Sequence, residues 1–389
     1  MTFKHGITLT EITTGARTLT AVSTSIIGLV ATSGDANADI FPLDRPALIT
    51  DVEAAIAGAG TDGTLALSLR AIADQSRPII VVVRVEEGAD DAETASNVIG
   101  TTDANGQKTG MQALLAAQAQ LGVKPKIIGT PGLETQAVTA ALAVVAQKLR
   151  GFAYARAIGE TVAAAILYRA NFAERELMLL MPDFLAWDVT SAANVTSYAA
   201  ARAMGLRALI DETVGPHKTL SNVAVRGVVG LTKDIHWDIE DQASEAGLLN
   251  AAAVTTLIRT DSGYRFWGNR TCSDEPLFAF ESTVRVAQLL ADTIVNGMLW
   301  AIDKPLTPGL AKDIIETING FGRQLRASGV VLGFNAWFDE ANNSTASLKA
   351  GKLRIDYDYT VPPPLEDLGF NQRITDSYFA DFASQLAEA

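Results

Sequence analysis

The most informative part of the sequence is LRIDYDYTV at residues 353–361, followed directly by PPP at residues 362–364. Apolar and polar residues alternate with period two over the first stretch, which predicts a half-buried β-strand. The three prolines lack backbone N–H groups and hold the chain extended. A second strand-like run at residues 368–378 therefore cannot easily fold back onto the first. We expect that run to pair with the sheet edge of a neighbouring subunit.

The N-terminal residues 1–22 form a second predicted arm. They are polar and rich in threonine, with a short apolar alternation through Ile7 and Leu9. An ordinary hairpin with a proline-rich loop is the simpler alternative at the C-terminus. If both arms pair with neighbouring subunits, the residues that carry the exchanged strands are Ile7, Leu9, Ile355, Tyr357, Tyr359, Phe370 and Ile374.

The sequence of the central region predicts an α/β domain. Residues 78–85 are almost wholly apolar, as expected for a strand covered on both faces, and residues 26–31 form a second buried strand. After a polar loop at 86–108, strands and helices alternate, which indicates βαβ units around a mainly parallel sheet. The predicted strands span 126–129, 152–157 and 177–181, and the predicted helices span 51–57, 65–73, 110–121, 134–149, 160–173 and 194–213.

From residue 251 onward the pattern changes to an α+β domain. Its predicted strands are 254–259, 264–267, 330–338 and 353–361, and its predicted helices are 280–300 and 308–327. The fold class is therefore an α/β domain with a mainly parallel sheet, joined to an α+β C-terminal domain and flanked by extended arms. The predicted division of the chain is an arm at 1–22, outer α/β domain at 23–250, core domain at 251–365 and arm at 366–389.

Composition excludes several functional classes. The chain has 389 residues, 48% of them hydrophobic and 19% charged, and a formal net charge of −13. Such a charge argues against a nucleic-acid binder, which carries basic residues over its phosphate footprint. No run approaches the roughly 20 apolar residues that a bilayer span needs, and no secretory signal is visible. We therefore expect synthesis in the cytoplasm and no membrane binding by the subunit itself.

The sequence contains several weak matches to catalytic or ligand-binding patterns. Residues 58–63 read GAGTDG, but a helix precedes them where a dinucleotide site needs a strand, so a flexible loop is favoured. His236 lies near carboxylates without a nucleophile. Asp356 and Asp358 share the polar face of one strand, with too few oxygen ligands for a hard cation. Cys272, the only cysteine, is more typical of a buried small hydrophobe than of a reactive thiol.

Because each of these matches is weak, we predict no catalytic site, no cofactor and no metal. One feature outside the arms still indicates binding. The predicted helix at 308–327 has an apolar stripe opposite a polar one, and the polar stripe consists of Lys312, Glu316, Asn319, Arg323 and Arg326. Residues 304–326 contain four cations and two carboxylates in a strongly acidic chain. A solvated helix face explains such a stripe, and a docking surface for an acidic partner is the sharper alternative.

The segment GYRFWGNRT at 263–271, followed by two long helices and the strand at 330–338, resembles the tail sheath proteins of contractile phage tails. The similarity is greatest to the sheaths of P2-like phages and R-type pyocins, and the order of elements matches over nearly the whole chain. The resemblance implies a structural protein, not an enzyme. It implies stacked six-fold rings around a tail tube, with strands exchanged between subunits, and contraction that drives the tube through a bacterial envelope.

The same resemblance implies the partners and the tube-facing residues. They are further copies of the chain, the tail tube protein, and the baseplate and tail terminator proteins, in a phage tail or a released bacteriocin particle. The helix before the last strands is expected to face the tube through Lys312, Arg323 and Arg326. Two alternatives stay open at this point. One is a cytoplasmic α/β enzyme with an unrecognised carboxylate site, and the other is a sheath component of a type VI secretion apparatus.

Overall fold

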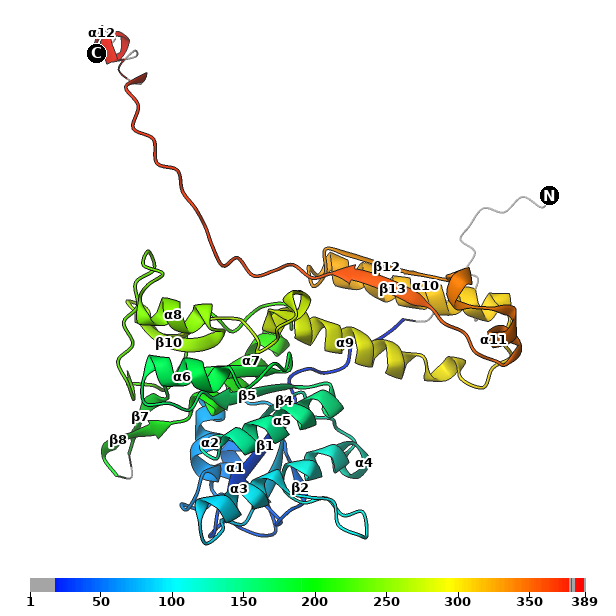
Figure 1. Ribbon diagram of the computed structural model, residues 1–389, viewed down its shortest axis with the longest axis horizontal. Helices are drawn as coiled ribbons and strands as arrows, with labels where there is room; N and C mark the ends of the chain where they lie inside the picture. Colours follow the sequence, from blue (N-terminus) through cyan, green and yellow to red (C-terminus); the bar gives the residue numbers. More distant parts are fainter. Residues whose placement is uncertain (1–17, 190, 378, 380–381, 388–389) are drawn as a thin grey trace, which may run out of the picture.

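The computed structural model describes residues 18–189, 191–377, 379 and 382–387. Its largest element is an eight-stranded sheet in which six neighbouring strands are parallel and the two edge strands are antiparallel (Figure 1). The strand order is β11-β10-β6-β5-β4-β1-β3-β2, with bounds β1 Ile27–Thr32, β2 Pro46–Ile49, β3 Ile80–Val85, β4 Ile127–Gly129, β5 Phe152–Arg156, β6 Leu177–Met181, β10 Val254–Thr260 and β11 Gly263–Trp267.

Helices cover both faces of this sheet and create two separate apolar cores. One core lies beneath α1 (Val52–Ile56), α2 (Leu65–Ala73) and α7 (Ala199–Thr213). The other lies beneath the opposite set, which is α3 (Asp91–Ile99), η1 (Gly110–Ala116), α4 (Ala117–Leu121), α5 (Gln136–Leu149), α6 (Val162–Arg169) and α8 (Glu245–Ala251). Because both faces are covered, the central strands are apolar throughout, and the predicted α/β class is confirmed.

Threonine side chains fix the starts of several helices. The hydroxyl of Thr135 accepts a hydrogen bond from the Val138 N–H at the start of α5, and Thr161 does the same at the start of α6. Such caps satisfy backbone donors that have no partner inside the helix. A small antiparallel sheet at one end of the α/β region consists of β7 (Phe184–Asp188), β8 (Ala193–Ser197) and β9 (Gly230–Leu231).

A second unit extends from one side of the large sheet (Figure 1). In it the long helices α9 (Glu281–Gly297) and α10 (Pro308–Ala327) pack together beneath the antiparallel pair β12 (Gly333–Trp337) and β13 (Asp356–Thr360), and the buried side chains form a third core. Short helices complete the unit and the chain end: η2 (Pro276–Phe278), η3 (Leu299–Ala301), η4 (Glu340–Asn342), α11 (Thr345–Lys349) and α12 (Phe382–Ala387).

Three expectations about individual elements were wrong. The predicted loop at 86–108 contains α3, whose short helix buries only Val98 and so has little apolar signal. The predicted helix at 194–213 begins at Ala199, because residues 193–197 pair with β7. The predicted C-terminal strands at 254–259 and 264–267 join the large sheet instead, where β10 runs parallel to β6. The division of the chain into domains at these residue numbers stays a prediction.

Candidate assembly interface

The two-stranded sheet of β12 and β13 contains two of the residues predicted to exchange strands, Tyr357 and Tyr359 on β13. Tyr357 stacks on Phe334 with ring centroids 5.7 Å apart and on Tyr359 at 6.2 Å. Phe334 and Tyr359 pack against the third core. Ile355 comes just before β13 and is half-buried. Because only these two strands form the sheet, each strand has one edge without a neighbouring strand among the described residues.

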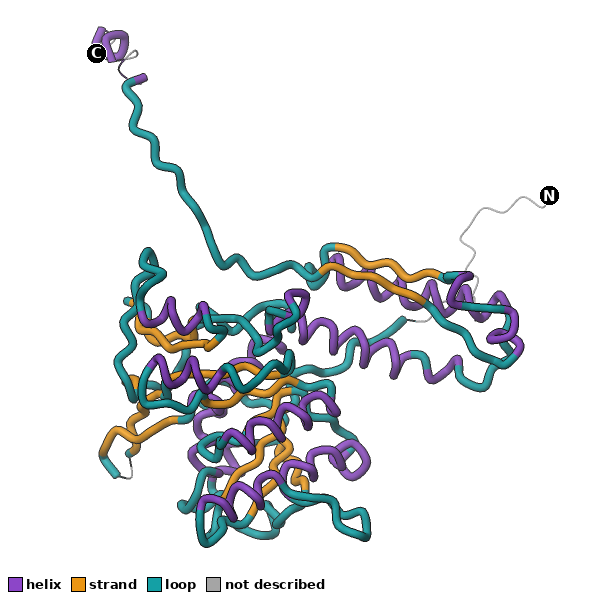
Figure 2. Tube along the Cα trace, in the orientation of Figure 1, coloured by secondary structure: helices purple, strands orange, loops and turns teal. Residues whose placement is uncertain are grey.

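The C-terminal arm follows β13 and leads away from the folded body (Figure 1, red). Residues 361–375 have no regular secondary structure, and Figure 2 shows them as one continuous loop. Three apolar side chains on the arm are strongly exposed: Leu368 at 61%, Phe370 at 85% and Ile374 at 96%. Apolar side chains at such exposure have no core of their own, so the structure places the predicted residues Phe370 and Ile374 on a free segment.

The base of this arm is fixed by Arg270, within the quoted WGNRT sequence. Its guanidinium binds both carboxylate oxygens of Glu366 and lies 5.4 Å from the ring centre of Phe280. The Glu366 carboxylate is the leading cause of a raised Arg270 pKa. The arginine therefore connects the loop after β11 to the start of the arm.

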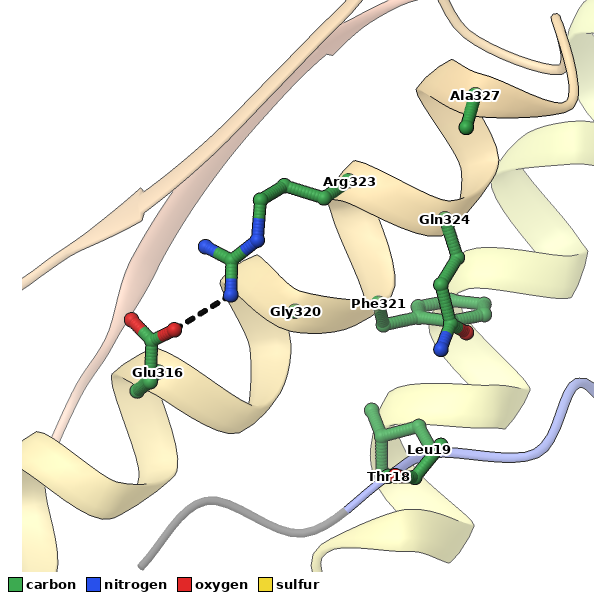
Figure 3. Close-up of a pocket in the computed structure, with 8 residues that line it drawn as sticks. All are labelled: Thr18, Leu19, Glu316, Gly320, Phe321, Arg323, Gln324 and Ala327. Carbon is green, nitrogen blue, oxygen red and sulfur yellow. Dashed lines mark hydrogen bonds and ion pairs between the residues drawn. The ribbon is translucent and has the colours of Figure 1, made fainter.

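The first described residues run along the second unit. Leu19 is buried in the third core, and Val22 donates its N–H to the hydroxyl of Thr293 on α9. The predicted exchange residues Ile7 and Leu9 lie outside the described residues. A groove of about 450 Å³ separates this segment from α10, and Figure 3 shows its lining of Thr18, Leu19, Glu316, Gly320, Phe321, Arg323, Gln324 and Ala327.

The polar face of α10 is largely as predicted. Lys312, Arg323 and Arg326 are exposed, and Arg323 pairs with Glu316, about two helical turns away (Figure 3). Asn319 differs, because it is half-buried and not on the solvated stripe. Its side chain donates to the backbone oxygen of Ala336 at 2.9 Å and accepts from the Ala336 N–H at 2.8 Å. The polar stripe in the sequence does not reveal that the Asn319 side chain binds the backbone of β12.

A buried chain of charged groups joins α9 to the large sheet, and the sequence analysis missed it. Glu281 accepts hydrogen bonds from the hydroxyl of Tyr154 on β5 and from Arg207 on α7. Arg207 and Arg285 both bind Asp211. Although burial opposes it, the pKa of Arg207 is raised by Asp211 and Glu281. Charged residues spaced along a helix normally indicate a solvated face, so the pattern of residues on α9 does not predict this burial.

A second buried ion pair lies on the same helix. The ammonium of Lys126, just before β4, binds Asp292 and the backbone oxygen of Leu149. Burial lowers the Lys126 pKa to about 8, against the opposing effect of Asp292. Arg150 and Lys124 also contact Asp292, at 3.0 and 3.5 Å. Together the two charged clusters attach α9 to the sheet over most of the helix length.

The carboxyl ends of the parallel strands contain a pair of carboxylates. Asp183, just after β6, accepts a hydrogen bond from the N–H of Ala199 at the start of α7. Burial, together with the charge of Asp183, raises the pKa of Glu134 to about 7. A binding site often occupies this edge in α/β proteins, but these two groups are not part of any cluster of three metal-ligating side chains among the described residues.

The weak catalytic patterns have structural explanations. The loop at 58–63 follows α1, and the carboxylate of Asp35 accepts the N–H groups of Thr61 and Asp62, so these donors are already occupied. The backbone N–H of His236 binds Glu245. Cys272 is buried, and burial raises the pKa of its thiol to about 12. Among the described helices, none has the length and apolar character that crossing a bilayer requires.

These features define a class of protein. It is a structural subunit with a free apolar arm and a sheet whose edges are not fully paired. Three family models cover the chain in sequence order: the Gp18 domain III N-terminal region of tail sheath proteins at 24–85, the phage tail sheath protein central domain at 106–272, and the phage tail sheath C-terminal domain at 273–375.

Individual relatives agree with these models. The chain is 53% identical to the tail sheath protein of Escherichia phage P2, over 99% of this chain and 98% of that protein. It is 35% identical to a putative prophage major tail sheath protein of Pseudomonas aeruginosa strain UCBPP-PA14, over 98% and 99% of the two chains. The chain belongs to the phage tail sheath family. It is a structural subunit of a contractile tail sheath, within a phage tail or tail-like particle, and not an enzyme.

Solved structures show the same fold at low sequence identity. The sheath of an extracellular contractile injection system, PVC, in its contracted state has a TM-score of 0.74 at 16% identity, over 97% of this chain and 99% of that one. The helical sheath of the anti-feeding prophage, also contracted, has a TM-score of 0.73 at 16% identity, over 96% and 99%. The resemblance deduced from residues 263–271 is therefore confirmed at the level of family and fold.

Proposed function

We propose that the subunit polymerises as stacked six-fold rings around a tail tube, linked by β-strands that the arms exchange between subunits. The observation that carries this proposal is the free C-terminal arm. Its apolar side chains Leu368, Phe370 and Ile374 are 61–96% exposed, and the three prolines before them keep the arm away from β13. A sheet with open edges on one copy and an unpaired apolar arm on another are complementary.

Exchanged strands suit a sheath that contracts and drives its tube through a bacterial envelope. Each backbone hydrogen bond contributes about 0.5–1.5 kcal/mol, and a strand forms several of them, so the links survive while the folded bodies rotate. The rearrangement needs no bound nucleotide if the contracted packing of subunits is the more stable of two arrangements. Two solved sheaths of similar fold were captured in the contracted state, and one of them is a helical sheath. Other similar chains belong to the baseplate of the anti-feeding prophage.

The proposed partners are other copies of this chain, the tail tube protein, and the baseplate and tail terminator proteins. The surface proposed for the tube is the exposed face of α10 with Lys312, Arg323 and Arg326. Among the described residues, neither Lys312 nor Arg326 has an ion-pair partner, so both cations are available to an acidic surface. Exposed pairs of this kind contribute about 0–1 kcal/mol each, which lets contraction break many of them together.

Deletion of residues 366–389 tests the proposal. We expect a folded protein, because the deleted residues lie outside all three cores, and we expect no hollow helical tubes by electron microscopy. A length-preserving variant, with serine at Leu368, Phe370 and Ile374, should fail in the same way.

Leu167→Ser is the matched control, since Leu167 on α6 is 72% exposed and distant in sequence from the arm. It should assemble normally. Unimpaired tubes after the deletion would remove the C-terminal arm from the assembly mechanism.

A further inference from the structure

The connection between α9 and α10 is unusually apolar for an exposed segment. Connecting segments on a protein surface are normally polar, but residues 298–307 read MLWAIDKPLT, with two charged residues. Backbone hydrogen bonds form successive turns, from the Ala301 N–H to the Met298 oxygen and from the Lys304 N–H to the Ala301 oxygen. The Lys304 ammonium lies over the ring of Trp300, 4.6 Å from its centre. The apolar side chains are therefore presented on an ordered turn.

Apolar side chains on and around this connection are exposed, and we call them the tip patch. The end of α9 and the start of α10 lie at the end of the second unit that is farthest from the large sheet (Figure 1). The tip patch consists of Val295 at 54% exposure, Leu299 at 70%, Ile302 at 65% and Leu306 at 36%. A single exposed apolar side chain needs no explanation, but several along one ordered turn indicate a binding surface.

The opposite end of the second unit, beside the large sheet, exposes leucines that we call the base patch. They are Leu277 at 75%, Leu332 at 58% and Leu365 at 76%. Arg270 joins the segments of the first and last of these, because it binds Glu366 and lies over the ring of Phe280. The N–H of the second donates to the oxygen of Thr360 at the end of β13. The second unit therefore has an exposed apolar surface at each end.

The base patch also lies where the C-terminal arm begins, since Leu365 directly precedes Glu366. If the arm pairs with the sheet of a second copy, as proposed above, that copy lies beside the start of the arm. The β12–β13 sheet belongs to the second unit, so the second unit of the neighbouring copy is the part nearest to the base patch. Its tip patch is an apolar surface that the exchanged strands do not use.

We infer that the tip patch of one copy packs against the base patch of the next copy, in a head-to-tail contact that repeats around each ring. This inference rests on the proposed assembly and adds a second contact between the copies that the arms connect. Burial of the apolar side chains in both patches drives the contact. Two different patches of one chain form a heterologous contact, which closes into a ring when the rotation between copies allows it.

The charges at the two ends do not oppose this contact. Asp274, Glu275 and Asp367 are exposed beside the base patch. The connection between α9 and α10 has one carboxylate, Asp303, and one cation, Lys304, so it has no net charge. The two surfaces therefore do not meet with like net charge.

Disulfide cross-linking in assembled tubes tests the pairing. Cysteine replaces one tip residue and one base residue in the same chain, in all combinations of Leu299, Ile302 or Leu306 with Leu277, Leu332 or Leu365. The native Cys272 is buried and gives little background. In a head-to-tail contact each copy joins two others, so we expect at least one combination to give a ladder of oligomers on a denaturing gel after oxidation. A disulfide needs Cα atoms about 4.4–6.8 Å apart, so a ladder requires direct contact of the patches.

Single-cysteine variants are the first control, and each base cysteine combined with Leu167→Cys on α6 is the second. Both should give less than about one tenth of the yield, because neither places two thiols within the distance that a disulfide needs. Dimers from a single tip cysteine would indicate a tip-to-tip contact and would overturn the inference. The inference would also fail if tubes form normally but none of the combinations cross-links above the controls. Absence of tubes in the parent protein would instead contradict the proposed function.

Removal of the apolar side chains gives an independent measurement. Leu299→Ser combined with Ile302→Ser should raise the critical concentration for tube formation about tenfold or more, because burial of each such side chain contributes at least that factor. Leu167→Ser combined with Ile239→Ser is the matched control, since these side chains are 72% and 71% exposed and lie outside both patches. Its critical concentration should stay that of the parent. No rise in the tip variant, or an equal rise in the control, would overturn the inference.

Discussion

Arg270 binds Glu366 through two hydrogen bonds, from Nε to one carboxylate oxygen at 3.1 Å and from Nη2 to the other at 2.5 Å. The two residues are 96 positions apart, and the contact ties the loop after β11 to the first residues of the arm. A two-point contact fixes direction as well as distance, so it determines how the arm leaves the body.

We predict that Arg270→Lys loosens the arm without unfolding the subunit. A lysine retains the charge but not the two-point geometry, and a pair this exposed contributes only about 0–1 kcal/mol to stability. The motion of a spin label on a cysteine substituted for the exposed Asp367 should therefore increase while the urea midpoint stays nearly constant. The exchanged pair, Arg270→Glu with Glu366→Arg, should partly restore the restriction of the label. Equal mobility of the label in Arg270→Lys and in the parent would show that the contact does not hold the arm.

The charged cluster beneath α9 gives a prediction about stability. Glu281→Ala leaves the buried Arg207 without one of its two carboxylates, which should lower the free energy of unfolding by about 3–5 kcal/mol. Glu316→Ala removes the partner of Arg323 on the surface and should change it by less than about 1 kcal/mol. Urea unfolding of both variants at one pH measures the difference. Similar small effects would mean that water reaches Glu281.

Glu134 gives a prediction about pH. Its pKa in the folded protein is about 7, above the ordinary value of 4.5, so its stabilising contribution is complete below 4.5 and is lost as pH rises through 7. Glu134→Gln cannot ionise. We expect it to match the parent in stability at pH 4 and to exceed it by about 1–3 kcal/mol at pH 8. Urea unfolding at both pH values measures this, and a gap of the same size at both would refute the raised pKa.

Charge reversal on α10 tests the proposed tube surface. Lys312→Glu combined with Arg326→Glu should weaken assembly on purified tail tubes severalfold, because the exposed cations would become like charges toward an acidic partner. Arg323→Glu should act in the same direction and would also repel Glu316. Lys349→Glu on α11 combined with Lys352→Glu just after it makes the same change in net charge as the double variant and is the control. Assembly that is equally weakened by the control would point to net charge and not to this helix face.

The elements with long apolar patterns were predicted closely. Helices α2 and α10 begin and end at the predicted residues, since each has a continuous apolar stripe, and α10 begins with a proline directly after a threonine cap. Strand β3 was found from its run of valines. Periodicity reports burial, and these segments are buried in the way that their pattern indicates.

Other features depend on partners that a single sequence does not reveal. Glu281, Arg285 and Asp292 lie on one side of α9. Charged residues on a helix are ordinarily solvated, but these three meet Arg207, Asp211 and Lys126 from elements far away in the chain. The pairing of β10 with β6 is likewise a long-range contact, so a change in local pattern at residue 251 did not mark a change of sheet.

The proline triplet also limits how far joined subunits can separate. Three successive prolines favour an extended conformation that rises about 3.1 Å per residue, so the seven steps from Val361 to Leu368 span about 22 Å. Such a stretch resists both shortening and further extension. Two copies connected through it would stay within a nearly constant separation at this joint, however much their bodies turn, and the spacing of the lattice would be set by the length of one short covalent connection.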